Sequence, residues 1–177
     1  MHFDPDAANW LSAHRDLLLR KRGGGVPANP VDEAGVIDLL SAYAVFYDAG
    51  DIDALLDLFS PDATYASYLG SYTGHADLRA NFAPLVERYD GAAHMVTNTT
   101  VLVTSENEAE AVSYLLAQIQ TNDGVAYAFT GTYQDRLERT DGLWRFKSRL
   151  VLDGLAHTIN AIPVENRLPG ATHKEDE

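Results

Sequence analysis

The 177-residue chain contains no cysteine. Disulfide bonds, cysteine nucleophiles and thiolate metal sites are therefore excluded. Basic residues are also scarce, because 13 lysines and arginines stand against 26 acidic residues and the formal net charge is −13. Nucleic acids and anionic membranes bind to basic surfaces, so we expect neither of them as a partner.

Long apolar runs and the usual cofactor motifs are missing as well. No window approaches the ~18 consecutive apolar residues of a membrane-spanning helix, and the first residues lack the apolar core of a signal peptide. A cytoplasmic protein is therefore expected. None of the six histidines forms the His-x-x-x-His pair of a helical zinc site, and no glycine-rich phosphate loop is present. We expect neither a metal nor an organic cofactor.

The chain divides into three parts by composition. Residues 1–30 read as an N-terminal arm, with an amphipathic helix over 5–22 and a linker rich in glycine and proline. Residues 31–157 read as the main domain. Residues 158–177 are expected to form an irregular tail.

In the main domain, helical patterns precede strand patterns. Apolar residues at helical spacing predict three helices, over 33–48, 52–59 and 76–89. A tyrosine-rich hairpin is expected over 63–73. Alternating β-branched and aromatic residues, separated by short turns, predict four long strands, over 93–104, 109–121, 125–139 and 143–156. Helices grouped before strands are typical of an α+β fold, and a long curved sheet around a helix leaves room for a pocket.

Asp48 stands out on the first helix of this domain. One line of the helix surface, which we expect to be buried, is formed by Ile37, Ser41, Ala44 and Asp48. An isolated buried carboxylate is costly unless it is paired or used. The sequence therefore predicts a functional site at Asp48, although a residue in the last turn of a helix is the simpler interpretation of Asp48 alone.

The stretch over 43–63 (YAVFYDAGDIDALLDLFSPDA) resembles the opening of SnoaL-like proteins of the nuclear transport factor 2-like superfamily. Later segments agree with this resemblance, namely GSYTG at 70–74, HMVTN at 94–98 and GTYQDRLERTDGLWRF at 131–146. The resemblance covers roughly residues 33–155. It implies a cone-shaped, curved antiparallel sheet wrapped around helices, of the nuclear transport factor 2-like or cystatin-like type, here with an extra N-terminal helix.

The resemblance also implies site residues. Three cofactor-free lyases of the superfamily are similar in pattern: scytalone dehydratase, bile-acid 7α-dehydratase and hexachlorocyclohexane dehydrochlorinase. They use an aspartate at the end of the first helix with a histidine of the first long strand, and Asp48 and His94 match these positions. Tyr43 matches a catalytic tyrosine of the bile-acid enzyme, and Tyr47 matches a site tyrosine of scytalone dehydratase. The stretch 125–130 lacks the second histidine of scytalone dehydratase, so we do not expect scytalone as the substrate.

Further candidates come from strand alternation. One face of the strand over 93–104 is expected to carry His94, Val96, Asn98, Thr100 and Leu102. On that face Asn98 either orients a substrate oxygen or makes a hydrogen bond within the sheet, and His94 taken alone reads as a core histidine. The aromatic candidates for the pocket wall are Tyr65, Tyr127 and Phe129, which otherwise read as packing residues.

Basic and acidic residues late in the sheet give looser candidates. Arg149 and Asp153 match polar positions of the lyases. The alternation of Arg145, Lys147 and Arg149 instead predicts side chains that face solvent or another subunit.

These observations predict a cofactor-independent lyase, of the dehydratase or dehydrohalogenase type, or an isomerase. It would act on a hydrophobic small molecule, with His94 as general base held by Asp48. The alternative is a non-catalytic module, either a small assembly subunit of a ring-hydroxylating dioxygenase or a small-molecule carrier. We also expect a homodimer or homotrimer, because the open face of a curved sheet needs cover.

Overall fold

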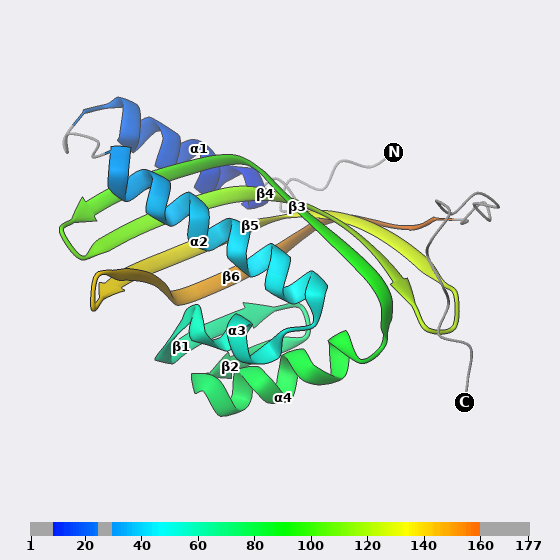
Figure 1. The fold of residues 1–177 in the computed structure, drawn as a ribbon. Coiled ribbons are helices and arrows are strands. Elements are labelled where there is room, and N and C mark those ends of the chain that lie inside the picture. Colours follow the sequence, from blue (N-terminus) through cyan, green and yellow to red (C-terminus); the bar gives the residue numbers. More distant parts are fainter. Residues whose placement is uncertain (1–8, 25–29, 160–177) are drawn as a thin grey trace, which may run out of the picture.

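The computed structural model of the chain describes residues 9–24 and 30–159, and its fold is of the α+β class (Figure 1). Three helices come first, α1 (Asn9–Arg22), α2 (Pro30–Ala49) and α3 (Ile52–Asp57). A hairpin and a helix follow, β1 (Phe59–Ser67), β2 (Gly70–Thr73) and α4 (Gly74–Val86). Four long strands come next, β3 (Tyr89–Ser105), β4 (Glu108–Thr121), β5 (Ala126–Thr140) and β6 (Leu143–Ile159).

Most predicted elements form, with ends shifted by a few residues. Asp51 caps α3 as expected, because its carboxylate accepts a hydrogen bond of 3.0 Å from the backbone N–H of Ala54. The helix predicted over 52–59 ends earlier, at Asp57, and β1 begins at Phe59, before the hairpin predicted over 63–73. Parts of the predicted arm and tail, residues 1–8, 25–29 and 160–177, lie outside the described residues.

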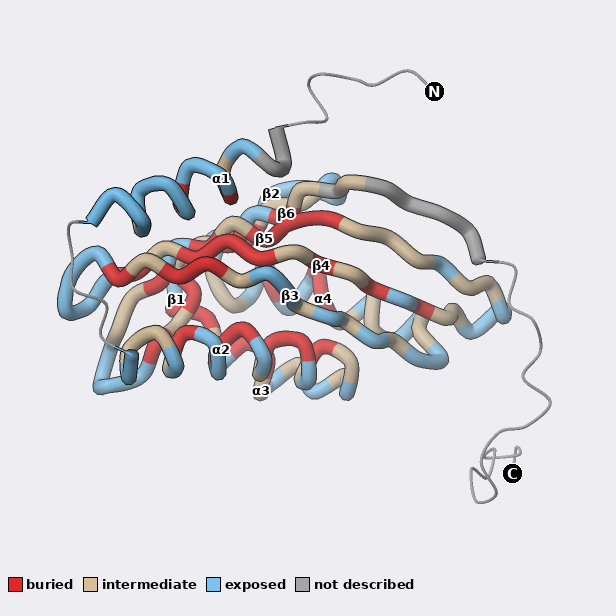
Figure 2. Tube along the Cα trace, turned by 90° about the horizontal axis from the view of Figure 1, so that it is seen from above, coloured by how far each residue is buried: buried red, intermediate tan, exposed pale blue. Residues whose placement is uncertain are grey.

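The six strands form one curved, open sheet in the order β2-β1-β6-β5-β4-β3. Neighbouring strands are antiparallel except β1 and β6, which run parallel. Helix α2 lies against one face of the sheet and α1 against the other (Figures 1 and 2). The main core fills the space between α2 and the sheet, where Tyr43, Phe59 and Phe146 are almost fully buried.

Helix α2 begins and ends at residues suited to those positions. Pro30 occupies its first turn, where a missing N–H costs nothing. At the other end Gly50 has a φ of 69°, its N–H bonds to the Tyr47 carbonyl, and the Asp51 N–H bonds to the Phe46 carbonyl. This pair of bonds is a Schellman motif, and it ends the helix directly after Asp48 and Ala49.

The buried face of α2 differs from the predicted one. Ile37 is 46% exposed and Ser41 is also exposed, so the line through them is not the helix's buried centre. The buried stripe lies one position earlier and consists of Val36, Leu39, Leu40, Tyr43, Ala44 and Tyr47. Because neighbouring positions differ by about 100° around a helix, this shift places Asp48 at the border of the core instead of its middle.

A bulge inverts the faces of β3. In β3 the register slips between Thr97 and Thr100, where Asn98 has a φ of 49°. His94 and Val96 therefore face the α2 side together with Val101 and Val103, while Thr100 faces α1, and the prediction of one shared face is wrong.

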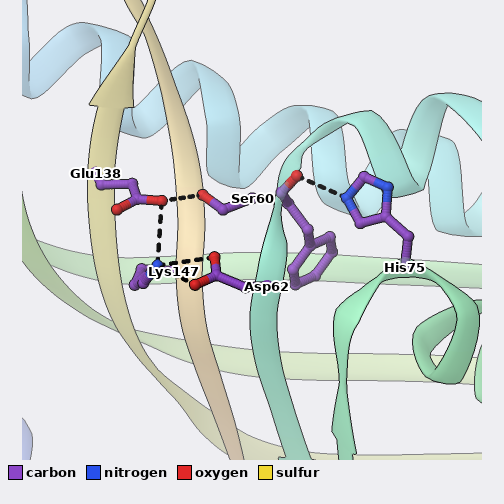
Figure 3. Close-up of polar contacts among 6 residues, drawn as sticks. Ser60, Asp62, His75, Glu138 and Lys147 are labelled. Atoms are coloured by element: carbon purple, nitrogen blue, oxygen red, sulfur yellow. Dashed lines mark hydrogen bonds and ion pairs between the residues drawn. The ribbon is translucent and has the colours of Figure 1, made fainter.

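Polar contacts fasten β1 to the β5–β6 hairpin, away from the α2 side of the core (Figure 3). The Ser60 hydroxyl donates to the Glu138 carboxylate. The Lys147 ammonium lies 2.8 Å from both carboxylate oxygens of Asp62 and 3.6 Å from Glu138. His75 donates through Nε2 to the Phe59 carbonyl oxygen at 2.9 Å. These contacts hold the start of β1, and with it the ring of Phe59, in the core.

Candidate active site

A cavity of 620 Å³ opens between α2, α4 and the inner face of the sheet. Its volume is in the range of small-molecule sites. Seven tyrosines line it, Tyr43, Tyr47, Tyr65, Tyr68, Tyr89, Tyr127 and Tyr133, with aliphatic side chains and Phe129 between them. A wall of this kind suits an apolar ligand that carries a few polar groups.

Asp48 and His94 meet at this cavity, from the last turn of α2 and from β3. His94 Nδ1 lies 2.5 Å from Asp48 Oδ1, and the His94 backbone N–H donates to Asp48 Oδ2 at 2.8 Å. The His94 side chain is 6% exposed and that of Asp48 is 23% exposed. Both carboxylate oxygens thus hold one residue, and they fix both the backbone and the ring of His94.

This contact determines which nitrogen faces the cavity. A carboxylate can only accept, so Nδ1 carries the proton and donates it to Asp48. In the neutral imidazole, Nε2 is then the unprotonated nitrogen, and it has no hydrogen-bond partner among the described residues. The ring lines the cavity, so a basic nitrogen is presented to whatever the cavity holds.

Aromatic rings enclose the imidazole. The Tyr47 ring lies 4.8 Å from it between centroids, at 62°, and the Phe129 ring lies 6.5 Å away, at 80°. These edge contacts leave little freedom of rotation for His94. They also reduce water around the nitrogen, which strengthens its electrostatic interactions.

The tyrosines near His94 remain neutral. Burial raises the pKa of Tyr47 well above its ordinary value, and nearby Tyr43 and Tyr89 add to the rise. Burial also raises the pKa of Tyr43, although the charge of Arg149 and a hydrogen bond with Tyr65 oppose this. Both hydroxyls therefore keep their protons at neutral pH and can donate hydrogen bonds to a ligand oxygen or halogen.

A buried ion pair lies beneath the cavity floor. Arg149 donates from Nε and Nη2 to the two carboxylate oxygens of Asp135, at 2.8 and 2.9 Å, and both side chains are fully buried. The guanidinium carbon lies 4.0 Å from the ring centres of Tyr43 and Tyr133 and 4.1 Å from that of Phe146. A positive charge is thus held behind the tyrosines that line the site.

The prediction that Arg149 alternates outward is wrong. The β5–β6 register slips between Arg136 and Leu137, so that Phe146 and Arg149 both face inward. A regular hairpin around the turn at 141–142 would place Ser148 opposite Asp135, whereas the bulge places Arg149 there. No residue pattern in the sequence marks this bulge. The pairing of Arg149 with Asp135 therefore could not be predicted from strand alternation.

The other candidates divide into two groups. Tyr65, Tyr127 and Phe129 line the cavity, as do Tyr43 and Tyr47. Asn98 does not, because it is exposed at the bulge of β3. The backbone of Asp153 pairs with Gly131, and its side chain lies outside what the structure describes.

Several cavity residues were missed in the sequence, among them Arg88 and Tyr89. These two lie at the end of the predicted third helix, whereas α4 already ends at Val86 and β3 begins at Tyr89. Burial raises the pKa of Tyr89, opposed by its hydrogen bond with Tyr47. The tyrosine row of the cavity therefore continues from α2 to the start of β3.

In the part of the chain that the structure describes, no group of three or more histidines and carboxylates is arranged to hold a metal ion. Across residues 9–24 and 30–159, no helix has the length and apolarity needed to cross a membrane.

Comparison with known proteins places this fold in a family. A candidate aromatic ring hydroxylase from Novosphingobium aromaticivorans superimposes with a TM-score of 0.72 at 27% identity, over 75% of this chain and 96% of that one. A candidate scytalone dehydratase from the same species gives 0.69 at 20% identity, over 78% and 96%. Hexachlorocyclohexane dehydrochlorinase LinA-type3 from Novosphingobium barchaimii gives 0.66 at 20% identity, over 75% and 92%.

No curated protein matches the sequence significantly. The model of the SnoaL-like domain matches residues 31–150, which include α2, the cavity and most of the sheet. The chain belongs to the SnoaL-like domain family.

Proposed function

We propose that this chain is a cofactor-independent lyase, of the dehydratase or dehydrohalogenase type, or an isomerase, and that its substrate is a hydrophobic small molecule. The observation that carries the proposal is the contact between Asp48 and His94 at an aromatic cavity. An imidazole held by a carboxylate, with its second nitrogen free toward a cavity, is a general base in position.

In the proposed reaction, His94 Nε2 removes a proton from a carbon that a neighbouring group makes acidic. The positive charge that forms on the imidazole is stabilised by Asp48, which already accepts the Nδ1 proton at 2.5 Å. Departure of halide from the adjacent carbon then completes an elimination. For a hydroxyl leaving group, the imidazolium returns its proton to the leaving oxygen, which departs as water. Return of the proton to a different carbon would give an isomerisation instead, so the same base serves both reactions.

The tyrosines supply the acidic side of this chemistry. Tyr43 or Tyr47 would donate a hydrogen bond to the leaving group or to a carbonyl oxygen on which negative charge develops. The guanidinium of Arg149, stacked on the Tyr43 ring at 4.0 Å, would favour that charge from behind the ring. Arg149 is a positioning residue in this proposal, because aromatic rings separate it from the cavity.

The structural neighbours agree with this class of reaction. Two of them are named for a dehydratase and a dehydrochlorinase, both of which are lyases. At 20% identity, these neighbours support the fold of this chain. Elimination chemistry is proposed for it from the contact between Asp48 and His94.

Turnover measurements on variants test the proposal. A panel of hydrophobic β-hydroxy and β-halo carbonyl compounds is incubated with the protein, and loss of water or halide is followed by mass spectrometry. On the best substrate, His94→Ala should lower kcat by about 10²–10⁴-fold, because a general base contributes that much. Asp48→Asn should also lower kcat, and it should change KM less than it changes kcat.

Asn98→Ala is the matched control, because Asn98 is a polar residue of the same strand that lies outside the cavity. It should keep wild-type turnover. Full activity in both His94→Ala and Asp48→Asn would remove the dyad from the account.

A second candidate is a non-catalytic role, either as a small assembly subunit of a ring-hydroxylating dioxygenase or as a carrier. The neighbour with 27% identity is named for aromatic ring hydroxylation, which favours the first form. Co-purification with a large iron–sulfur subunit would support assembly. A tightly bound ligand that the protein never converts would support a carrier.

A further inference from the structure

The charges around the cavity are unevenly distributed. Aspartate and glutamate are absent from the described lining residues, although the chain carries a net charge of −13. Arg88 is the single arginine or lysine of that lining, and it is exposed at the entrance beside Tyr89. His94, the other basic residue, already has its carboxylate partner. The lining therefore favours an anion at one position only.

Arg88 is available for such an anion. It makes no ion pair with any described residue. Three carboxylates lie near it, Glu87 and Asp90 along the chain and Asp123 in the adjoining turn. Asp90 accepts from Gln120 and Asp123 accepts from Thr121. The hydrogen bond from Thr121 lowers the pKa of Asp123, and the charge of Arg88 contributes to this lowering without an ion-pair contact. The charge of Arg88 nevertheless reaches its surroundings, because it lowers the pKa of Tyr89 against the larger effect of burial.

The backbone at Arg88 is held firmly. The turn between β4 and β5 donates to it twice, from the Asn122 N–H to the Arg88 carbonyl at 3.0 Å and from Asn122 Nδ2 to the Glu87 carbonyl at 2.8 Å. These bonds fasten the segment after α4 to the turn between β4 and β5. The guanidinium therefore extends from a fixed position at the entrance, which is the arrangement a binding residue needs.

We propose that the substrate is an amphipathic carboxylate, whose acid group binds to Arg88 at the entrance while its apolar body lies along the tyrosines toward His94. This inference rests on the proposed function, because it takes the cavity as the substrate site. The guanidinium fork matches the two oxygens of a carboxylate, and the apolar wall matches a ring system or a long hydrocarbon chain.

The spacing of Arg88 and His94 limits how far apart the two groups of the substrate can lie. Arg88 and His94 are six residues apart along an extended segment, so their Cα atoms are at most about 20 Å apart at ~3.3 Å per residue. Both residues line the cavity. In the proposed substrate the reactive carbon is therefore separated from the carboxylate by an apolar body that fits within this distance.

Binding of two fluorescent probes tests this inference. The probes are 1-pyrenebutyrate and the uncharged 1-pyrenebutanol, which share one apolar body. The wild-type protein should bind the butyrate more tightly than the alcohol. In Arg88→Gln this preference should fall about fivefold, as for the loss of one ion pair of about 1 kcal/mol, while the affinity for the alcohol stays constant.

Arg79→Gln is the matched control, since it removes the same charge from an exposed arginine of α4 that does not line the cavity. It should keep the wild-type preference. No binding of the butyrate, equal binding of both probes by the wild type, or an unchanged preference in Arg88→Gln would each overturn the inference. His94→Ala should keep the preference, so a failure of the proposed catalysis is distinguishable from a failure at Arg88.

Discussion

At the scale of single residues, the ion pair of Arg149 and Asp135 carries a high desolvation cost. Both side chains have no exposed surface, and removing two charges from water costs several kcal/mol. Two parallel hydrogen bonds and three aromatic faces repay part of that cost, but Arg149 Nη1 is buried without a hydrogen-bond partner. The pair is therefore sensitive to the loss of either member.

We predict that Asp135→Ala lowers the free energy of unfolding by about 3–5 kcal/mol, because it leaves a buried guanidinium uncompensated. The double variant Asp135→Leu/Arg149→Met should lose clearly less, since it buries no charge. Urea denaturation followed by circular dichroism measures both values. A loss under about 1 kcal/mol in Asp135→Ala would show that the charge of Arg149 is neutralised by other means.

Asp48 and Arg149 show which residues the sequence can reveal. The sequence singled out Asp48 as a carboxylate on a line of the helix that was expected to be buried. The buried stripe lies one position earlier, and Asp48 is still found at the border of the core. Its partner His94 came from the family resemblance. Arg149 and Asn98 were misplaced because one extra residue in a strand reverses inside and outside, and no residue type marks these bulges.

At the scale of elements, the end of α2 fixes the position of Asp48. Gly50 adopts a φ of 69°, and a Cβ at this position would lie 2.9 Å from Cγ1 of Val86 on α4. The Schellman motif and the contact with α4 therefore depend on the same glycine. The Asp48 carboxylate sits within one turn of this motif.

We predict that Gly50→Ala lowers the free energy of unfolding by about 2–4 kcal/mol, from left-handed strain of ~1–2 kcal/mol and from overpacking against Val86. Gly124→Ala is the matched control, because Gly124 has a φ of 82° with open space around its Cβ position. It should cost about 1 kcal/mol. Equal losses in both variants, measured by thermal or urea unfolding, would contradict the packing of α2 against α4 at Gly50.

The order and type of these elements were accessible from the sequence. Helical spacing and strand alternation carry that signal over ten residues or more, and the Asp141–Gly142 turn adopts positive φ at both residues, as a tight hairpin requires. The parallel pairing of β1 with β6 was not accessible. It joins segments about 85 residues apart, and it depends on tertiary packing around Phe59 and Phe146.

At the scale of the whole molecule, the two faces of the sheet have different neighbours. Helix α2 covers the inner face, whereas α1 covers part of the outer face through contacts such as His14 Nε2 to Thr100 Oγ1 at 3.0 Å and Arg20 to Glu110 at 2.6 Å. The outer face extends beyond α1, and Met95 on it is 40% exposed. An exposed apolar side chain on an uncovered part of a sheet is suited to contact with a second copy.

We propose on this basis that the protein is a homodimer or homotrimer. Size-exclusion chromatography with light scattering at micromolar concentration should give two or three times the monomer mass of 19.4 kDa. Met95→Glu, which places a charge on this face, should shift the mass toward the monomer. A wild-type protein that is monomeric at every concentration would contradict the proposal.

The central claim is that Asp48 fixes His94 with a proton on Nδ1 and a free, basic Nε2 toward the cavity. Long-range ¹H–¹⁵N NMR of the histidine side chains at pH 7.5 measures this tautomer directly, and His94→Gln assigns the signal. The account predicts a protonated Nδ1 and an unprotonated Nε2 in the wild type, with this preference lost in Asp48→Asn. A wild-type His94 that carries its proton on Nε2, or that exchanges rapidly between the two tautomers, would contradict it.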